Sequence, residues 1–365
     1  MRRVVIKLGS SIVANDEGEV RTEVLTAVSD AVAAERAAGH EVVVVTSGAI
    51  ARGMRVMELG ARPTAIEELQ AASAVGQGKL YRVYDELLLE RGVTSAQILL
   101  TFFDVSARTH YLNVRQTLRT LLDWGVVPII NENDTTTTDE ISFGDNDFLA
   151  AQVAVLVAAD TLILLTEPDG LFTADPRRDP DARLVPLVED FEALESLSIT
   201  QETSTLGSGG MRSKVVAAEM ATAAGVNAVV CSGRRPEALR RVLVGAPEGT
   251  RFPARAARYS SFKLWLKYAK PAHGTVTVDA GAARALIEKG TSLLPVGVVA
   301  VSGRFVAGDA VEIVTADDGR VLGKGIANYA AADLERVMGM KSSQVGDVLP
   351  GGSDEAIHRD YLVLS

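Results

Sequence analysis

The sequence predicts an α/β protein, a three-layer αβα sandwich with a mainly parallel sheet, followed by a small β-rich C-terminal domain. From residue 1 to about residue 245, short β-branched runs alternate with longer amphipathic runs. The short runs are apolar on both faces, which suits the central strands of a parallel sheet covered by helices. After residue 273 the pattern changes to closely spaced strand-like segments, as is typical of a small β domain.

Six segments of the first part are expected to be strands. A helix is expected over residues 23–39, where the apolar pattern ends at Gly39, a residue that commonly closes helices. The expected strands are "RVVIKL" (3–8), "EVVVVT" (41–46), "AQILL" (96–100), "VVPIIN" (126–131), "TLILLT" (161–166) and "NAVVCS" (227–232).

We expect a first domain over residues 1–248, a basic linker over 249–273 and a small domain over 274–365. Residues 249–270 hold six basic residues and no acid. The strand-like segments that follow are "GTVTVD", "VGVVAVSG", "DAVEIVT" and "RVLGKGIANY". Residues 271–365 carry a net charge of −4.

Composition excludes several classes of protein. Of the 365 residues, 47% are hydrophobic and 23% charged, which indicates a globular chain long enough for two domains. The net charge of −10 disfavours general nucleic-acid binding. The single cysteine, Cys231, excludes a disulfide framework and indicates a reducing compartment, and we interpret it as a small buried hydrophobe. Four histidines and one cysteine disfavour a zinc site.

No membrane segment is expected. The most apolar stretch, residues 149–165, is interrupted by Gln152 and Asp160 and is shorter than the roughly 20 residues of a spanning helix. The N-terminus reaches Lys7 after three apolar residues, too few for the core of a signal peptide. We therefore expect a soluble, cytoplasmic protein.

Small and polar residues follow the expected strands: "KLGSS", "TSGAI", "NENDT", "TEPDG" and "CSGRR". In open α/β sheets, ligands bind outside the carboxyl ends of the strands. These loops are therefore expected to converge on one crevice.

Three of the expected turns suit an anion. Lys7 ends the first strand just before Gly9, and a buried lysine there is costly unless it meets an anion or reaches solvent. Ser47 and Gly48 lead into a helix and leave backbone donors uncovered, although simple tight packing would give the same pattern. "LGSGGMRSK", residues 206–214, matches neither G-x-x-x-x-G-K-[ST] nor G-x-G-x-x-G, yet it is a glycine-rich turn that opens a helix with Lys214 in its first turn.

The acidic stretch "INENDTTTTDEISFGDND", residues 130–147, has six acids and no Lys or Arg. It does not fit the calcium-binding template of an EF-hand. We expect Asp134 and Asn146 to bind an ammonium or amide of a small substrate. Asp147 is expected to orient the lysines, and it could also cap the helix that follows.

Five segments occur in the order found in the amino acid kinase family, so the chain resembles that family over nearly its whole length. They are "VVIKLGSS", "VVTSGAIARG", "INENDTTTTDEISFGDND", "LLTEPDGLFTADPR" and "GSGGMRSK". The part from about Gly274, through "GTSLLPVGV" and "GKGIANYAAADLERVMG", resembles a PUA domain. Within the family the similarity is greatest to members that phosphorylate the side-chain carboxylate of L-glutamate with ATP, the first step of proline biosynthesis.

The resemblance implies a role for each matched residue. Lys7, Lys214 and Asp147 would be catalytic, and Ser47, Asp134 and Asn146 would bind L-glutamate. Backbone donors would come from Gly9, Gly48, Gly209 and Gly210. The implied ATP-binding residues are Lys7, Gly9, Thr166, Glu167, Ser208, Gly209, Gly210, Met211, Arg212, Ser213 and Lys214.

Two departures and several partners accompany the resemblance. Glu167 stands where many members have Asp, and Ser208, Arg212 and Ser213 differ from the commoner threonine-rich turn. Mg²⁺ is expected to arrive with ATP and to take few protein ligands. The family also implies feedback inhibition by proline and assembly into dimers or tetramers.

Two other functions stay open. A kinase of the same superfamily could act on N-acetylglutamate, aspartate or a nucleoside monophosphate instead. Alternatively, an RNA-binding protein could carry a degenerate kinase domain. The net negative charge of the C-terminal part disfavours RNA binding by the PUA-like domain, whereas the basic segment 251–270 favours it.

Overall fold

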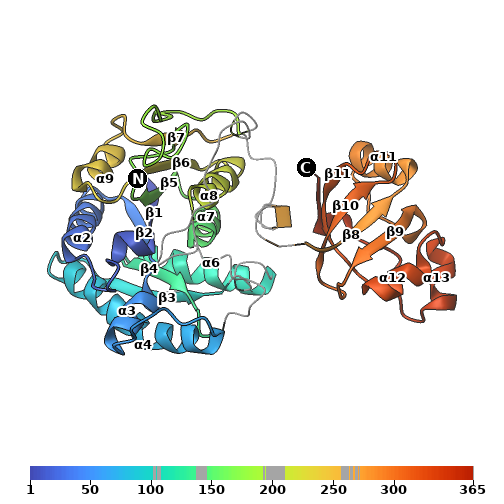
Figure 1. Cartoon of the computed structure of the whole chain (residues 1–365), viewed down its shortest axis with the longest axis horizontal. Coiled ribbons are helices and arrows are strands. Elements are labelled where there is room, and N and C mark those ends of the chain that lie inside the picture. The colour runs from blue at the N-terminus through green and yellow to red at the C-terminus, as the bar shows by residue number, and fades with distance from the viewer. Residues whose placement is uncertain are drawn as a thin grey trace. The chain divides into compact units, whose positions relative to one another are not determined.

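The computed structural model divides the chain into two compact units, Met1–Arg258 and Tyr259–Ser365 (Figure 1). It describes all residues except 102–103, 105–107, 137–145, 192–193, 195–209, 256–262, 264–265, 268–269, 271 and 365, and the side chains of 108–109. Each unit has its own sheet and its own core.

The first unit contains a seven-stranded sheet in the order β3-β4-β2-β1-β5-β6-β7, parallel except for β7. Its strands are β1 (Arg3–Leu8), β2 (Glu41–Val45), β3 (Ser95–Leu100), β4 (Val127–Glu132), β5 (Thr161–Thr166), β6 (Asn227–Ser232) and β7 (Thr250–Phe252). Its described helices are α1 (Ser10–Val13), α2 (Thr22–Ala37), α3 (Ala49–Val56), α4 (Ile66–Leu89), α6 (Arg108–Asp123), α7 (Asn146–Leu156), α8 (Met211–Ala223) and α9 (Pro236–Leu243).

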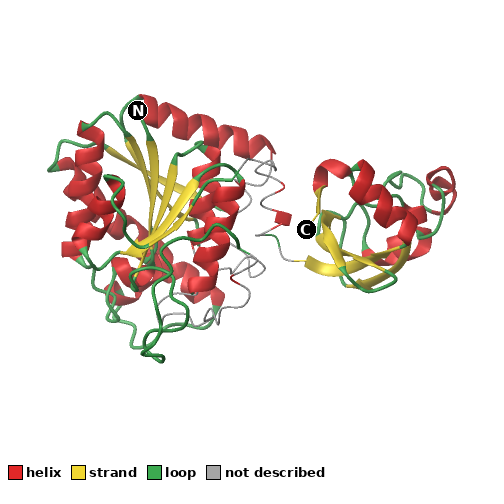
Figure 2. Ribbon diagram, turned by 90° about the horizontal axis from the view of Figure 1, so that it is seen from above, coloured by secondary structure: helices red, strands yellow, loops and turns green. Residues whose placement is uncertain are grey.

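Helices cover both faces of this sheet, which confirms the predicted three-layer fold (Figure 2). On one face α2 packs against β2, α4 against β3 and α9 against β6, whereas α6, α7 and α8 pack on the other. All five residues of β2 are buried, as are five of the six in β1 and in β5. The six predicted strands are confirmed to within one residue at either end, because apolar β-branched residues can fill both layers of such a sandwich.

The central strand β1 divides the sheet into two halves. The strands β2, β4 and β3 lie on one side of it, and β5, β6 and β7 lie on the other. The parallel strands end at Leu8, Val45, Leu100, Glu132, Thr166 and Ser232, all on the same edge of the sheet. The loops that follow these strands therefore meet at this edge, as the sequence predicts.

Two glycines bring α3 and α4 into close contact. A Cβ atom at Gly76 of α4 would lie 1.9 Å from the carbonyl oxygen of Ala49 and 2.4 Å from the backbone nitrogen of Gly53. A Cβ atom at Gly53 would lie 1.7 Å from the carbonyl oxygen of Ala72. Since backbone atoms occupy these positions, only glycine allows α4 to lie so close to α3.

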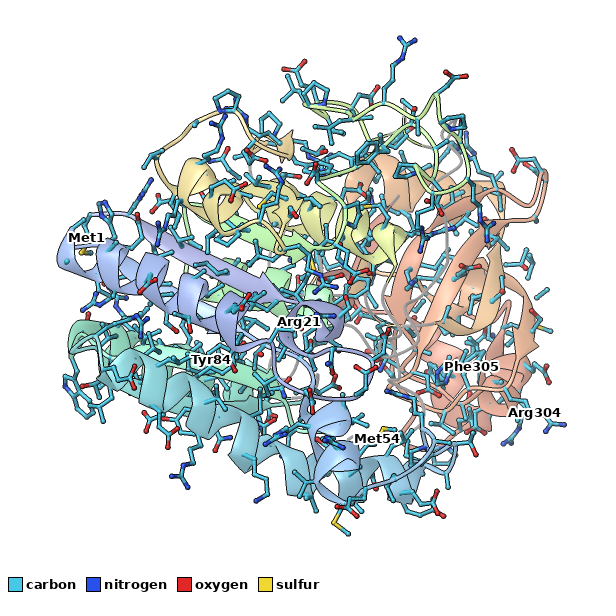
Figure 3. All side chains as sticks on the ribbon, turned by 60° about the vertical axis from the view of Figure 1, so that its left-hand side comes forward. Met1, Arg21, Met54, Tyr84, Arg304 and Phe305 are labelled. Atoms are coloured by element: carbon cyan, nitrogen blue, oxygen red, sulfur yellow. The ribbon has the colours of Figure 1, made fainter. Side chains whose placement is uncertain are left out.

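The second unit is built on a five-stranded sheet in the order β12-β11-β10-β8-β9, in which only the β8–β10 pair is parallel. Its core includes Val276, Leu286, Ile313 and Phe305, the last labelled in Figure 3. The elements are β8 (Ala272–Val278), α11 (Ala280–Lys289), η3 (Pro295–Gly297), β9 (Val298–Gly303), β10 (Ala310–Thr315), β11 (Val321–Ile326), α12 (Ala331–Val337), α13 (Ser342–Val348), η4 (Arg359–Tyr361) and β12 (Leu362–Leu364). This confirms the predicted small β-rich domain.

The basic segment expected as a linker contacts elements of both units. Its first residues form β7, which pairs antiparallel with β6 and so belongs to the first sheet. Further along, Lys324 of β11 donates through Nζ to the carbonyl of Lys270 at 2.9 Å and to that of Lys267 at 3.4 Å. Burial of the Lys324 side chain lowers its pKa, which the nearby Glu312 opposes. None of the described helices is long and apolar enough to cross a membrane.

The contact between α3 and α4 predicts opposite effects for two glycines of the same helix. Gly76→Ala should destabilise the fold by about 1–3 kcal/mol, because the new methyl group forces the helices apart. Gly78, where nothing lies within 4 Å of a Cβ position, serves as the control. Gly78→Ala should stabilise the helix by up to about 1 kcal/mol. Denaturant unfolding of both variants measures the difference, and equal stability would contradict the packing described.

Candidate active site

A buried carboxylate joins two buried lysines at the edge where the strands end. Oδ1 of Asp147 lies 2.7 Å from Nζ of Lys7, and Oδ2 lies 3.0 Å from Nζ of Lys214. Lys7 and Asp147 are fully buried, and Lys214 is 5% exposed. The structure therefore brings together all three residues that the resemblance makes catalytic.

Each member of this cluster comes from a different element. Lys7 lies near the end of β1, Asp147 in the first turn of α7 and Lys214 in the first turn of α8. Ser213 Oγ also reaches Oδ2 of Asp147, at 2.9 Å, and contacts the carbonyl of Gly210 at 2.8 Å. Gly210 is the N-cap of α8 and uses no side chain for capping. The beginnings of α7 and α8 are thereby held at the end of β1.

The cluster brings two ammonium groups to one carboxylate. Two helices begin beside them, and their positive ends add to the field. Buried ammonium groups are costly unless they meet anions. The arrangement is therefore suited to a polyanionic ligand such as a phosphate chain.

On the other side of β1, Asn146 links α7 to β2 and β4. Its Nδ2 donates to the carbonyl of Thr46, which follows β2, and to Oδ1 of Asn131 in β4, the latter at 2.6 Å. Asn131 in turn donates through Nδ2 to Oε1 of Gln77 on α4, at 2.6 Å. Consecutive residues of α7, Asn146 and Asp147, thus reach the two halves of the site.

Asp134 lies in the turn after β4, where Ser73 Oγ of α4 donates to its Oδ2 at 2.5 Å. Burial raises the pKa of the Asp134 carboxyl above its usual value, which the Ser73 hydrogen bond and the charge of Arg62 partly oppose. A desolvated carboxylate of this kind gains from a cationic partner. Asp134 is therefore suited to binding an ammonium group.

Two small turns complete the described part of the crevice. Ser47 is buried, and Gly48 has φ +102°, a backbone conformation that residues other than glycine rarely adopt. Gly9 leads into α1, and a Cβ atom there would lie 3.7 Å from Nζ of Lys7. With no side chain at position 9, the backbone beside Nζ of Lys7 is not covered by a Cβ atom.

The other predicted nucleotide-binding residues are less closely grouped. Thr166 is buried at the end of β5, while Glu167 is half-exposed and pairs with Arg234 at 3.1 Å. Met211 and Arg212 lie in the first turn of α8, where Arg212 is exposed. Ser208 and Gly209 lie outside the described residues, as do residues 137–145 of the acidic stretch.

Sequence reasoning did not identify the contribution of α4. Ser73, Gln77 and Tyr84 lie at helical spacing on one stripe, and each contacts the substrate side of the crevice or its support. The hydroxyl of Tyr84, labelled in Figure 3, is 2.8 Å from Oγ1 of Thr46. Polar residues that recur at i, i+4 and i+11 among apolar ones were the available signal.

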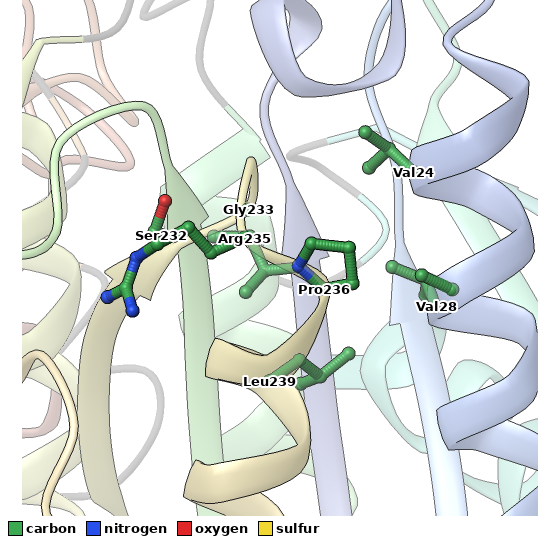
Figure 4. Close-up of a pocket in the computed structure, with 9 residues that line it drawn as sticks. Val24, Val28, Ser232, Gly233, Arg235, Pro236 and Leu239 are labelled. Carbon is green, nitrogen blue, oxygen red and sulfur yellow. The ribbon is translucent and has the colours of Figure 1, made fainter.

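A separate apolar hollow lies between α2 and the start of α9 (Figure 4). Val24 and Val28 of α2 face Pro236 and Leu239 of α9 across it, and Gly233 lies at its end. None of the residues expected to bind substrate or nucleotide lines this hollow.

Comparison with known proteins identifies the family of the chain and supports its fold. The family model "Amino acid kinase family" matches residues 2–232, and that of the PUA domain matches residues 274–349. The crystal structure of UMP kinase from Bacillus anthracis is similar in fold, with a TM-score of 0.50 at 19% identity. That likeness covers 70% of this chain and 97% of the kinase chain.

Relatives named glutamate 5-kinase align with the entire chain. The protein from Meiothermus ruber is 44% identical over 365 residues, which are 100% of this chain and 96% of the relative. The protein from Burkholderia mallei strain SAVP1 is 46% identical over 368 residues, covering 100% of this chain and 98% of the relative. The chain therefore belongs to the amino acid kinase family and carries a C-terminal PUA domain.

Proposed function

We propose that this protein transfers the γ-phosphoryl group of ATP to the side-chain carboxylate of L-glutamate, forming L-glutamyl 5-phosphate for proline biosynthesis. The observation that carries the proposal is the buried pair of lysines around Asp147, together with the acceptor oxygens of Asp134 and Asn146. The relatives named glutamate 5-kinase, similar over the whole chain, support the choice of acceptor.

The proposed chemistry needs no catalytic base. A carboxylate is already ionised and nucleophilic near neutral pH, so direct in-line attack on the γ-phosphorus requires positioning and charge stabilisation. Lys7 and Lys214 would neutralise charge on the transferring group, and Asp147 would keep both ammonium groups aimed at it. Ser47, Asp134 and Asn146 would hold the amino acid.

The nucleotide side of the proposal rests on the end of β5 and the beginning of α8. Thr166 and Glu167 would contact the nucleotide, with the turn from Ser208 to Lys214 around its phosphates. Gly9 would add a backbone donor. Position 167 carries Glu where many family members have Asp. In the described residues this Glu167 pairs with Arg234, and the structure therefore gives no further contact from which to judge the change.

Mg²⁺ fits the proposal as a companion of ATP. Among the residues that the structure describes, no group of three or more His, Cys, Asp or Glu side chains could hold a metal ion. Mg²⁺ would be held mainly by phosphate oxygens, as is usual for this ion with nucleotides, and would shield the charge of the phosphate chain.

Other expectations from the sequence stay predictions. They are inhibition by proline at a position overlapping the glutamate pocket, a cytoplasmic location and assembly into dimers or tetramers. The same holds for the expectation that the PUA domain does not bind RNA.

An assay for the acyl phosphate tests the proposal directly. With ATP, Mg²⁺ and hydroxylamine, L-glutamate should give ADP and γ-glutamyl hydroxamate, because hydroxylamine traps acyl phosphates. N-acetylglutamate, L-aspartate and UMP serve as competing acceptors. Turnover with one of these alone would overturn the choice of substrate, and no turnover with any acceptor would favour an RNA-binding protein.

Replacing one lysine of the cluster tests its catalytic role. Lys214→Ala should lower kcat by at least about 10²-fold, the effect of removing one preorganised donor to a transition state. Lys289→Ala, at the end of α11 in the second unit, is the control and should leave kcat unchanged. Near-normal turnover of Lys214→Ala, with an unchanged melting temperature, would exclude Lys214 from the mechanism.

The environment of Asp134 predicts a pH dependence. The KM for L-glutamate should rise as pH falls through the pKa of Asp134, since the protonated carboxyl no longer attracts an ammonium group. The Ser73 hydrogen bond lowers that pKa, so Ser73→Ala should move the rise in KM to higher pH. Comparing the two pH profiles cancels the titration of glutamate itself, and identical profiles would contradict the assignment.

A further inference from the structure

Backbone groups determine which way two amide side chains of the crevice point. The backbone N–H of Glu132 can only donate, and it lies 2.9 Å from Oδ1 of Asn131. The oxygen of Asn131 must therefore face this N–H, and its Nδ2 must face Oε1 of Gln77. The carbonyl of Thr46 can only accept, so Asn146 must present Nδ2 to it.

These contacts use both amide hydrogens of Asn146. One donates to the carbonyl of Thr46 and the other to Oδ1 of Asn131. Among the described residues, Oδ1 of Asn146 has no hydrogen-bond partner. Asn146 can therefore offer a ligand only an acceptor.

Asp134 offers the same chemistry, and its partner Ser73 lies one helical turn before Gln77 on α4. Ser73 contacts Asp134 and Gln77 contacts Asn131, and the two α4 residues are four positions apart on one face. Residues so spaced have Cβ atoms about 5–6 Å apart. A group that meets both Asn146 and Asp134 must be a hydrogen-bond donor, and a carboxylate among its partners favours a cation.

We infer that Gln77 is a positioning residue that makes the acceptor pocket selective for a substrate with a free, positively charged amino group. This inference rests on the proposed function, which places the amino acid at Asp134 and Asn146. Gln77 acts through Asn131: its oxygen accepts from Nδ2 of Asn131 and so acts together with the N–H of Glu132 to keep Oδ1 turned toward Asn146. Asn146 is in turn held by Oδ1 of Asn131 and by the carbonyl of Thr46.

The position of Gln77 is itself determined by packing. Its neighbour Gly76 lies against the backbone of α3, and α3 begins immediately after Ser47 and Gly48. Leu80 and Tyr84 continue the same stripe of α4 and are buried. Because α4 is held in place by this packing, Oε1 of Gln77 lies at a defined position for the hydrogen bond from Nδ2 of Asn131.

Four variants of the full chain test the inference. Gln77→Met removes the acceptor at similar volume, and Gln77→Asn withdraws it by one methylene. Gln77→Glu keeps an acceptor that Asn131 can reach. Gln116→Met, at an exposed site on α6, is the matched control.

Calorimetry measures binding of L-glutamate, L-2-hydroxyglutarate and ATP with Mg²⁺ to each protein. L-2-hydroxyglutarate has both carboxylates and a hydroxyl in place of the ammonium group. Gln77→Met and Gln77→Asn should each lose about tenfold in affinity for L-glutamate, the effect of one hydrogen bond. They should also lose much of their preference over the hydroxy acid, with ATP affinity unchanged to within about twofold. Gln77→Glu and Gln116→Met should behave as the wild type.

Three results would overturn the inference. They are a wild-type preference in both Gln77→Met and Gln77→Asn, an equal loss of glutamate and ATP binding, and a Gln77→Glu variant as impaired as Gln77→Met. Equal wild-type affinity for the two acids would also overturn it. Binding of L-glutamate without hydroxamate formation would overturn the proposed function alone, whereas binding of neither acid would overturn both.

Discussion

The sharing of one buried carboxylate by two buried lysines is the constraint on which the first unit depends. Asp147 holds Lys7 of β1 and Lys214 of α8 at once, so the central strand and two helices meet at a single side chain. Three charges removed from water are costly unless well paired, and Asp147 pairs with both ammonium groups. Under the proposed function a bound phosphate chain would also pair with these ammonium groups, which connects the energetics of the fold with the proposed chemistry.

Asn146 and Asp147 show how one helix start serves two halves of a site. Asp147 faces the lysines, while Asn146 bonds the carbonyl that follows β2 and the amide of Asn131 in β4. Because β1 divides the sheet between these halves, the beginning of α7 has contacts on both sides. Under the proposed function, a shift of α7 would change the phosphate side and the acceptor side together, so the two substrates are kept in register by one element.

Much of the fold could be predicted because its signals are local. The strand around Val43 is apolar on both faces, which few arrangements except a covered sheet allow, and parallel strands bring their carboxyl ends together. Lys7, Asp147 and Lys214 could thus be expected at one edge. The roles of Gln77 and Ser73 were harder to predict, because their spacing shows only that they share one stripe of α4. Their contacts depend on the close approach of α4 to α3 at Gly53 and Gly76, which is a tertiary feature. Strand β12 was also missed, since its three residues are too few to show an alternating pattern.

The lysine cluster attracts ligands by charge, whereas the acceptor side binds them by hydrogen bonds. This difference decides where selectivity for the ligand can arise. Charge attraction falls slowly with distance and depends little on direction, so the lysine cluster can accept any suitably placed phosphate chain. Hydrogen bonds depend on direction and on which partner carries the proton, so the acceptor side distinguishes ligands through the orientation of two amides. The backbone groups of Glu132 and Thr46 hold these amides, and Gln77 adds a further acceptor from α4, whose backbone lies directly on α3 because of its glycine. The selectivity of the proposed kinase therefore depends on helix packing away from the reacting atoms, whereas its phosphoryl chemistry depends on Asp147 and the lysines beside it.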